Sequence, residues 1–163
     1  MKKDILEWKV NGEIIRIPCW CDNSSYTVNP KYINIASFAN GLIYISNHLG
    51  IGITNLKLQK LLSEIQVFYK KNCIGVFKDK PEIWRHGLVY PEVYRNYKAW
   101  FNDNIKVWDT KQVNKLEDED LIIIQELIIE YKDYDDWDMV RGNKEKIEDG
   151  YFDLIIERKI DMS

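Results

Sequence analysis

Residues 53–62 read Ile-Thr-Asn-Leu-Lys-Leu-Gln-Lys-Leu-Leu, and this stretch contains the strongest helix signal of the 163-residue chain. Thr54 has the side chain of a good helix N-cap, and apolar residues recur after it every three or four positions as far as Phe68. The spacing predicts a helix that begins after Thr54, runs to about Lys71 and buries its leucines.

Two further elements are expected on the N-terminal side of this helix. Asn29 and Pro30 predict the cap and first turn of another helix, and Gly50 predicts its end. Before it, two β-type runs flank Asn11 and Gly12, and an Asn-Gly pair is typical of a type I′ hairpin turn. We therefore expect a β-hairpin over about residues 5–17.

On the C-terminal side, three more helices are expected. Pro91 predicts the start of one, Leu116 lies near the start of the next, and Asp135 predicts the cap of a short helix that ends at Gly142. Short strands are expected at residues 76–77, 82–84 and 105–108. The tail from Tyr151 to Ile160 has the pattern of either a strand or a helix.

Together these elements predict an α+β fold that is predominantly α-helical. It is a compact bundle of about five helices with short β-strands and an N-terminal β-hairpin. Residues 1–29 are interpreted as the hairpin extension and residues 30–163 as one globular helical unit. The hydrophobic content of 45% and the aromatic content of 13% are typical of a chain that folds around a core.

Several classes of function are disfavoured by composition. No apolar run approaches the roughly 18–20 residues of a membrane span, and the first residues lack the apolar stretch of a signal peptide. We therefore expect a cytoplasmic protein with no membrane partner. Cys19, Cys21 and Cys73 have no zinc-site spacing to each other or to the two histidines, so neither a metal nor another cofactor is expected.

Charge is distributed unevenly along the chain. Residues 116–163 contain 16 of the 26 acidic side chains and only 6 of the 23 basic ones. One interpretation is an acidic helix that faces the basic body or water. The other is an acidic surface that recruits a basic partner or imitates a nucleic acid. Direct binding to nucleic acid is disfavoured, because such a surface repels phosphates.

A second informative stretch comes about twenty residues after the first: Trp84-Arg85-His86-Gly87-Leu88-Val89-Tyr90-Pro91-Glu92-Val93-Tyr94. The two stretches together resemble the hallmark of the Panacea domain family, SocA-like and GepA-like proteins common in phages and bacterial mobile elements. That hallmark is I-T-N-L-K-L-Q-K-L-L at a helix start, then W-x-x-G-P-V-x-P-x-V-Y before another helix. The resemblance extends from about Tyr32 to about Val140.

The chain departs from this hallmark at three places. Leu88 stands where the family has proline, and Tyr90 stands where it has a small aliphatic residue. The family's later His and Trp have no match, and this chain has Arg-Gly-Asn-Lys at residues 141–144. The resemblance implies an antitoxin without a catalytic centre that neutralises a toxin by direct binding. Its SocA branch implies a protease adaptor for the toxin.

Eight residues are predicted to contact a protein partner. Most are aromatic or arginine side chains, which are typical of interface hot spots, and two are polar residues of the first stretch. They are Trp20, Gln59, Lys60, Arg85, Tyr90, Arg95, Trp100 and Trp108. For Gln59 and Lys60 a structural role is also open, because a polar side chain on a packed helix can satisfy buried backbone beside residues 84–91.

Three functions follow from these observations. The first is an antitoxin that binds a toxin. The second is a phage-encoded inhibitor of a host defence protein that uses the acidic segment 117–138, since abundant Lys, Ile and Asn are compatible with an AT-rich genome. The third is an enzyme or ligand-binding protein built on His86 and the carboxylates of residues 135–138. We expect a non-enzymatic protein, because no phosphate loop or nucleophile motif is present.

Overall fold

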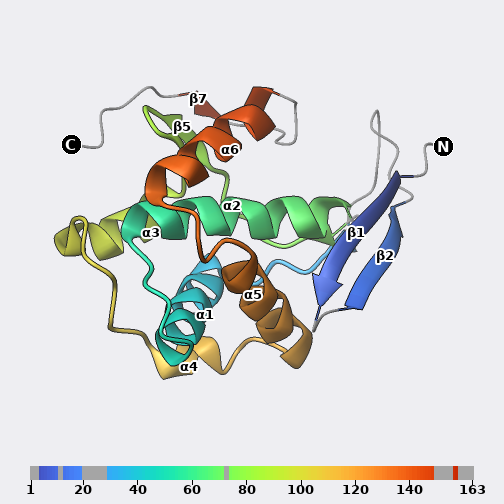
Figure 1. Ribbon diagram of the computed structural model, residues 1–163, viewed down its shortest axis with the longest axis horizontal. Coiled ribbons are helices and arrows are strands. Elements are labelled where there is room, and N and C mark those ends of the chain that lie inside the picture. Colours follow the sequence, from blue (N-terminus) through green and yellow to red (C-terminus); the bar gives the residue numbers. More distant parts are fainter. Residues whose placement is uncertain (1–3, 11–12, 20–28, 72–73, 149–155, 158–163) are drawn as a thin grey trace.

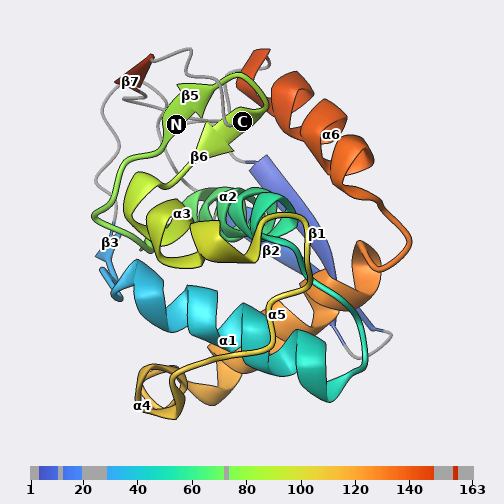
Figure 2. The ribbon, with the colours of Figure 1, turned by 90° about the vertical axis from the view of Figure 1, so that its left-hand side faces the viewer.

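Helix α2 (Asn55–Lys71) lies at the centre of the molecule, and 13 of its 17 residues are buried. Thr54 caps it as predicted, because its Oγ1 accepts the backbone N–H of Lys57 at 3.2 Å. Figure 2 looks nearly along α2, with α1 (Ile35–His48) and α5 (Asp118–Glu130) on one side and α6 (Asp136–Glu148) on the other. A central helix flanked on both sides explains why almost its whole circumference is buried.

The computed structural model describes residues 4–10, 13–19, 29–71, 74–148 and 156–157, and the side chains within 31–71 and 74–148. Six α-helices and one 3-10 helix, η1 (Lys98–Trp100), occur in this part, together with strands of two to seven residues. The expectation of an α+β, predominantly α-helical fold is confirmed. None of these helices has the length and apolar character that a membrane span requires.

The N-terminal hairpin is confirmed by its strand register. Strand β1 (Asp4–Val10) pairs antiparallel with β2 (Glu13–Cys19), with Val10 opposite Glu13. Asn11 and Gly12 lie between the strands and outside the described residues. Strand β1 contacts α5, so the hairpin lies at one end of the helical part (Figure 1). The division of the chain at residue 29 stays a prediction.

A small sheet lies on the side of α2 where α6 packs. Strand β5 (Glu82–Trp84) pairs antiparallel with β6 (Gly87–Val89) and parallel with β7 (Ile156–Glu157). The tail, for which strand and helix were both open, therefore contributes a strand where it is described. Gly87, the first residue of β6, has a φ of +98°, which glycine adopts without strain.

The start of α1 differs from the prediction. Residues 29–30 form β3 (Asn29–Pro30), which pairs parallel with β4 (Ile74–Gly75), and residues 31–34 have no regular secondary structure. Asn34 then caps α1, because its Oδ1 accepts the N–H of Ala36 at 2.9 Å. Both asparagines suit an N-cap, and the tertiary pairing of β3 with β4 selects the later one. The strand predicted at residues 76–77 lies instead at β4, because the residues of β4 are the ones that pair with β3.

Three of the helices on the C-terminal side begin close to where they were predicted. They are α3 (Pro91–Tyr97), α5, and α6, where Asp135 Oδ1 accepts the N–H of Asp138 at 2.8 Å. Helix α6 does not end at Gly142 as predicted but continues to Glu148. The short α4 (Thr110–Val113) was not predicted, and the strand predicted at 105–108 is absent from the described chain.

The hydrophobic core lies between α1, α2 and α5. Phe38 and Leu42 of α1, Leu58 and Leu62 of α2, and Ile124 of α5 are completely buried. Full burial of each such side chain stabilises the fold by about 1.5–3 kcal/mol relative to its exposure to water. Leu58, Leu61 and Leu62 are therefore core residues, as the spacing predicts, whereas Leu56 is only half-buried.

Candidate functional site

Polar side chains of α2 hold the surrounding segments by hydrogen bonds to their backbone. The Nδ2 of Asn55 donates to the carbonyl of Tyr94 in α3 at 3.1 Å. The Nζ of Lys57 donates to the carbonyls of Tyr131 and Tyr134 at 2.8 Å each. Because Tyr131 follows the last turn of α5, this cation also meets the negative end of the helix dipole. Polar side chains of the first informative stretch thus connect α2 to α3 and to the end of α5.

Gln59 is fully buried and satisfies the backbone of the second informative stretch. Its Oε1 accepts the N–H of Tyr90 at 2.9 Å, and its Nε2 donates to Oδ1 of Asn55 at 3.0 Å. The structure therefore corrects the prediction that Gln59 contacts a partner, because no part of the side chain reaches the surface. The alternative interpretation, a bond to buried backbone beside residues 84–91, is what the structure contains.

Lys60 is also buried, with 1% of its surface exposed, so its predicted partner contact is corrected as well. Its Nζ donates to the carbonyl of Leu88 at 2.7 Å, and no carboxylate of the described residues pairs with it. Burial, with a smaller contribution from the positive charge of Lys144, lowers the pKa of Lys60 to about 7.

Tyr90 is the third predicted contact that lies inside the molecule, with 1% of its surface exposed. Its hydroxyl donates to Oε1 of Gln66, and its ring packs edge-on against Phe77. Burial raises the pKa of Tyr90 well above its usual value. The larger residue at this position, compared with the hallmark, therefore fills the core and makes no surface contact.

Gly87 and Asn143 complete the contacts around Lys60. The Oδ1 of Asn143 accepts the N–H of Leu88 at 2.7 Å, and its Nδ2 donates to Oγ of Ser63 at 2.9 Å. A Cβ on Gly87 would lie 2.4 Å from Oδ1 of Asn143. Only glycine leaves room for this bond, and these contacts join β6, α2 and α6 at one buried point.

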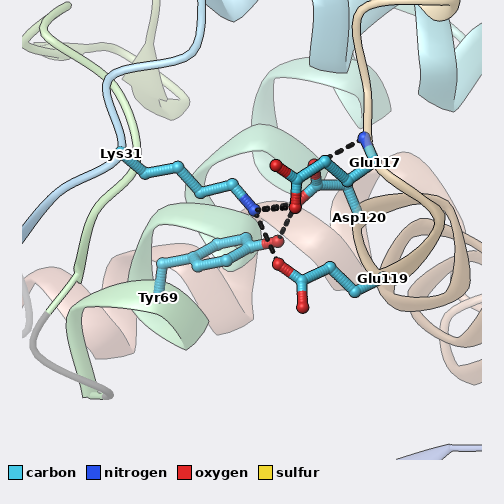
Figure 3. Close-up of polar contacts among 5 residues, drawn as sticks. All are labelled: Lys31, Tyr69, Glu117, Glu119 and Asp120. Atoms are coloured by element: carbon cyan, nitrogen blue, oxygen red, sulfur yellow. Dashed lines mark hydrogen bonds and ion pairs between the residues drawn. The ribbon is translucent and has the colours of Figure 1, made fainter.

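A second lysine lies in a cluster of carboxylates, which Figure 3 shows. The Nζ of Lys31 donates to Oδ1 of Asp120 at 2.7 Å and to Oε1 of Glu119 at 3.0 Å, and it lies 3.8 Å from Oε2 of Glu117. The hydroxyl of Tyr69 also donates to Asp120. Burial by itself lowers the pKa of Lys31, but the hydrogen bonds and charges of Asp120 and Glu119 outweigh it and raise the pKa.

Asp120 is completely buried and has a second role in this cluster. Its Oδ2 accepts the backbone N–H of Glu117 at 3.0 Å, which forms half of the capping box at the start of α5. Burial, together with the bond to Asp120, raises the pKa of Tyr69. The cluster joins the chain before α1 to α2 and α5, so its role is to stabilise the fold.

The best candidate for a contact surface is the loop of residues 101–109, which crosses α1 on its way to α4 (Figure 2). Ile105 is buried in the middle of this loop, its N–H donates to the carbonyl of Ile53 at 2.9 Å, and its carbonyl accepts Nδ2 of Asn47 at 2.9 Å. At the end of the loop, the N–H of Asp109 donates to Oδ1 of Asn40 at 2.8 Å. Side-chain amides of α1 thus fix the loop.

This fixed loop presents two large apolar side chains to solvent. Phe101 is 79% exposed and Val107 is 62% exposed, the two highest values among large apolar residues in the described part of the chain. Phe101 also has a φ of +50° and a ψ of −119°, a conformation that favours glycine. Such strain is costly and concentrates at functional positions.

Trp100 and Trp108, two of the predicted contacts, are half-buried at the two ends of this loop. The ring of Trp108 meets the ring of Tyr44 edge-on, with 5.7 Å between centroids. Beside these rings is a surface hollow of about 370 Å³, which α1, the loop, α4 and the start of α5 enclose. The hollow is lined by Tyr44, Trp108, Thr110, Val113, Asn114, Leu116, Asp118 and Leu121.

Neither Arg85 nor Arg95 lies on this loop. Arg85 lies in the turn between β5 and β6, Arg95 lies on α3, and both are exposed. Trp20 lies outside the described residues. Of the eight predicted contacts, Trp108 thus lies on the 101–109 loop, Trp100 lies directly before it at the end of η1, and three others lie in the interior.

The carboxylates proposed for an enzyme have structural partners. Asp136 accepts the hydroxyl of Thr54 at 2.8 Å, and Asp138 pairs with Arg141 and accepts the N–H of Asp135. The ring of His86 packs against Trp137, with 5.0 Å between centroids. Within the described residues, no group of three or more His, Cys, Asp or Glu side chains has the geometry of a metal site.

No family model matches this chain, and neither does any curated protein or solved structure. The resemblance of residues 53–62 and 84–94 to the Panacea hallmark therefore stays a prediction. The sequence pattern does not identify Phe101, Val107 or Tyr44, which lie on this candidate contact surface. Phe101 continues the apolar pattern of the helix that starts at Pro91, and its positive φ leaves no signal in the sequence.

Proposed function

We propose that this protein is a cytoplasmic binding protein that neutralises a second protein, in the manner of an antitoxin. The observation that carries the proposal is the fixed loop of residues 101–109 with Phe101 and Val107 exposed. A contiguous exposed apolar patch marks an interaction site, and we infer that Phe101 and Val107 of this loop belong to one such patch. A loop that is already ordered loses little conformational entropy when a partner covers it.

The resemblance to the Panacea hallmark supports the same proposal from a different direction. Most residues of that hallmark are buried here, including Gln59 and Lys60 of α2 and Val89 of β6. A family that shares an interior and varies its surface can bind different toxins with one fold. On this view the partner is chosen by loops such as 101–109.

The sharpest test is Phe101→Gly. Glycine adopts the φ of +50° without strain, so the variant should be more stable than the wild type by about 1 kcal/mol. It also removes the exposed ring, and loss of an interface hot spot weakens binding by about 2 kcal/mol or more, roughly thirtyfold. A variant that is more stable and yet fails to bind separates recognition from folding.

The assay is rescue of growth when the chain is co-expressed with the small protein encoded beside it, followed by calorimetry of the purified pair. Tyr32→Gly is the matched control, because Tyr32 is also an exposed aromatic with a positive φ, but lies before α1. Wild type and Tyr32→Gly should rescue growth, and Phe101→Gly should not. Full rescue by Phe101→Gly would contradict the assignment of this loop.

A second candidate function is favoured by the charge of α5 and its flanks. Asp118, Glu119, Asp133 and Asp135 are exposed there, and the segment 117–138 carries few basic residues. Such a surface suits an inhibitor that occupies the nucleic-acid site of a defence nuclease. Replacing these four acids with Asn or Gln should abolish inhibition of that nuclease without unfolding the protein, whereas Phe101→Gly should leave the inhibition intact.

A further inference from the structure

The hollow between Tyr44 and Trp108 has a chemistry that the loop alone does not explain. Its floor is apolar, since Val113 and Leu116 are buried, and two aromatic rings form one wall. Asp118 contributes a carboxylate at the start of α5, and no basic residue lines the hollow. The volume of about 370 Å³ is at the lower end of the range of ligand pockets, about 300–1,000 Å³, and suits one side chain.

We propose that this hollow receives an arginine side chain of the bound protein, with the guanidinium against Trp108 and Tyr44 and its N–H groups on Asp118. The inference rests on the proposed function, because it specifies what the partner inserts beside the 101–109 loop. Charge complementarity selects the occupant: an apolar side chain would leave the carboxylate without a partner, and an acidic one would meet its negative charge.

Arginine fits this lining better than lysine does. The guanidinium is flat, stacks on aromatic faces and donates two parallel hydrogen bonds to one carboxylate. Its aliphatic stem can cover the apolar floor at Val113 and Leu116. The polar side chains of Thr110 and Asn114, both exposed at the hollow, offer further acceptors for the remaining N–H groups.

The experiment titrates the full chain with N-acetyl-arginine methylamide and follows the indole N–H of Trp108 by NMR. Its resonance is assigned with Trp108→Phe. For a probe of this size we expect a Kd on the order of 1–10 mM. The matching citrulline compound has nearly the same shape without the charge, and it should cause no saturable shift. An equal response to citrulline, or no shift of Trp108, would overturn the proposal.

Two variants test the role of the carboxylate. Asp118→Asn should raise the Kd of the arginine probe about tenfold, because a charge-assisted hydrogen bond is lost. Asp103→Asn is the matched control, since Asp103 is exposed on the 101–109 loop but does not line the hollow. The Kd of the arginine probe should be unchanged in this variant. Asp118→Glu keeps the charge and should keep binding within about threefold. Equal affinity of Asp118→Asn and wild type would also overturn the proposal.

The same variants separate this inference from the proposed function. If Asp118→Asn rescues growth as well as wild type does while Phe101→Gly fails, the antitoxin proposal stands and the arginine proposal falls. If the arginine probe binds as expected and no neighbouring protein is neutralised, the arginine site stands and the antitoxin proposal falls.

Discussion

Lys31 and Lys60 both connect distant parts of the chain, but their surroundings are opposite. Lys31 is partly exposed and has carboxylates of Asp120 and Glu119 around its Nζ, so its pKa is raised. Lys60 is buried against the carbonyl of Leu88, so its pKa is lowered to about 7. The comparison teaches that a lysine can join segments either as a cation held by anions or as an amine held by backbone.

The largest expected effect is at the carboxylate end of the Lys31 connection. Asp120→Ala removes the buried acceptor of Lys31, Tyr69 and the Glu117 N–H. Removing one partner of a buried ion pair costs about 3–5 kcal/mol. Here the buried Tyr69 hydroxyl loses its acceptor, and Lys31 keeps only the exposed carboxylates of Glu117 and Glu119. Urea denaturation should show this loss of unfolding free energy. A decrease of the unfolding free energy by less than about 1 kcal/mol would mean that the cluster does not stabilise the fold.

A substitution at Gly87 tests the packing around Lys60 without replacing the lysine itself. Gly87→Ala places a Cβ 2.4 Å from Oδ1 of Asn143 at a φ of +98°, and should destabilise the fold by about 2–4 kcal/mol. Gly50→Ala is the control, since Gly50 has a φ of +71° but nothing within 4 Å of the added Cβ. Its cost should be about 1 kcal/mol. Equal costs in thermal unfolding would show that strain alone matters.

These two regions also show how far local sequence predicts the fold. Thr54, Pro91 and Asp135 are capping or first-turn residues whose effect is local, and each helix begins beside its signal. Asn29 and Asn34 are locally equivalent, and the pairing of β3 with β4 chooses between them. A signal that depends on a partner from a distant segment cannot be ranked from the sequence alone.

The departures from the Panacea hallmark illustrate the same limit. Leu88 has a backbone N–H that a proline lacks, and Asn143, in the other departing segment, accepts it at 2.7 Å. The sequence marks both positions as unusual, but only the fold brings them together. The sequence predicts that the helix ends at Gly142. The bonds of Asn143 to Leu88 and Ser63 instead hold α6 in helical form beyond that residue.

The candidate site was predictable in part. Trp100 and Trp108 have the residue type of interface hot spots, and both lie at the ends of the 101–109 loop. Gln59, Lys60 and Tyr90 have polar atoms that suit either a surface or a satisfied interior, and burial decides between these. The exposure of Phe101 was not predictable, because a positive φ at a non-glycine residue is set by the fixed ends of the loop and not by the local sequence.

The pH dependence of stability distinguishes the two lysines directly. From about pH 7 to its ordinary pKa of 10.5, Lys60 is protonated in the unfolded chain and largely neutral in the folded one. Because the unfolded state then binds more protons, the unfolding free energy should rise with pH, by up to about 1.4 kcal/mol per unit. Lys31 has the opposite sign: its stabilisation is complete below pH 10.5 and is lost as pH rises through its raised folded pKa.

Lys60→Met isolates the Lys60 contribution. The variant keeps most of the side-chain volume and has no proton to exchange, so its unfolding free energy should increase less steeply between pH 7 and pH 9 than that of the wild type. Urea denaturation at half-unit steps measures both slopes, and the difference should approach 1 kcal/mol per unit. Parallel curves would mean that Lys60 is charged in the folded protein.

The smallest expected effect is at the outer edge of the Lys31 cluster. Glu119 contacts Lys31 at 3.0 Å, as Asp120 does at 2.7 Å, but the Glu119 side chain is 67% exposed. Water and salt screen an exposed pair, so Glu119→Gln should cost less than about 1 kcal/mol. Raising the salt concentration to about 1 M should remove most of that small difference while leaving the effect of Asp120→Ala in place. If Glu119→Gln costs nearly as much unfolding free energy as Asp120→Ala, the stabilisation by Lys31 depends on how many carboxylates surround it. If Glu119→Gln costs much less, as we expect, the stabilisation depends on the one carboxylate that is buried.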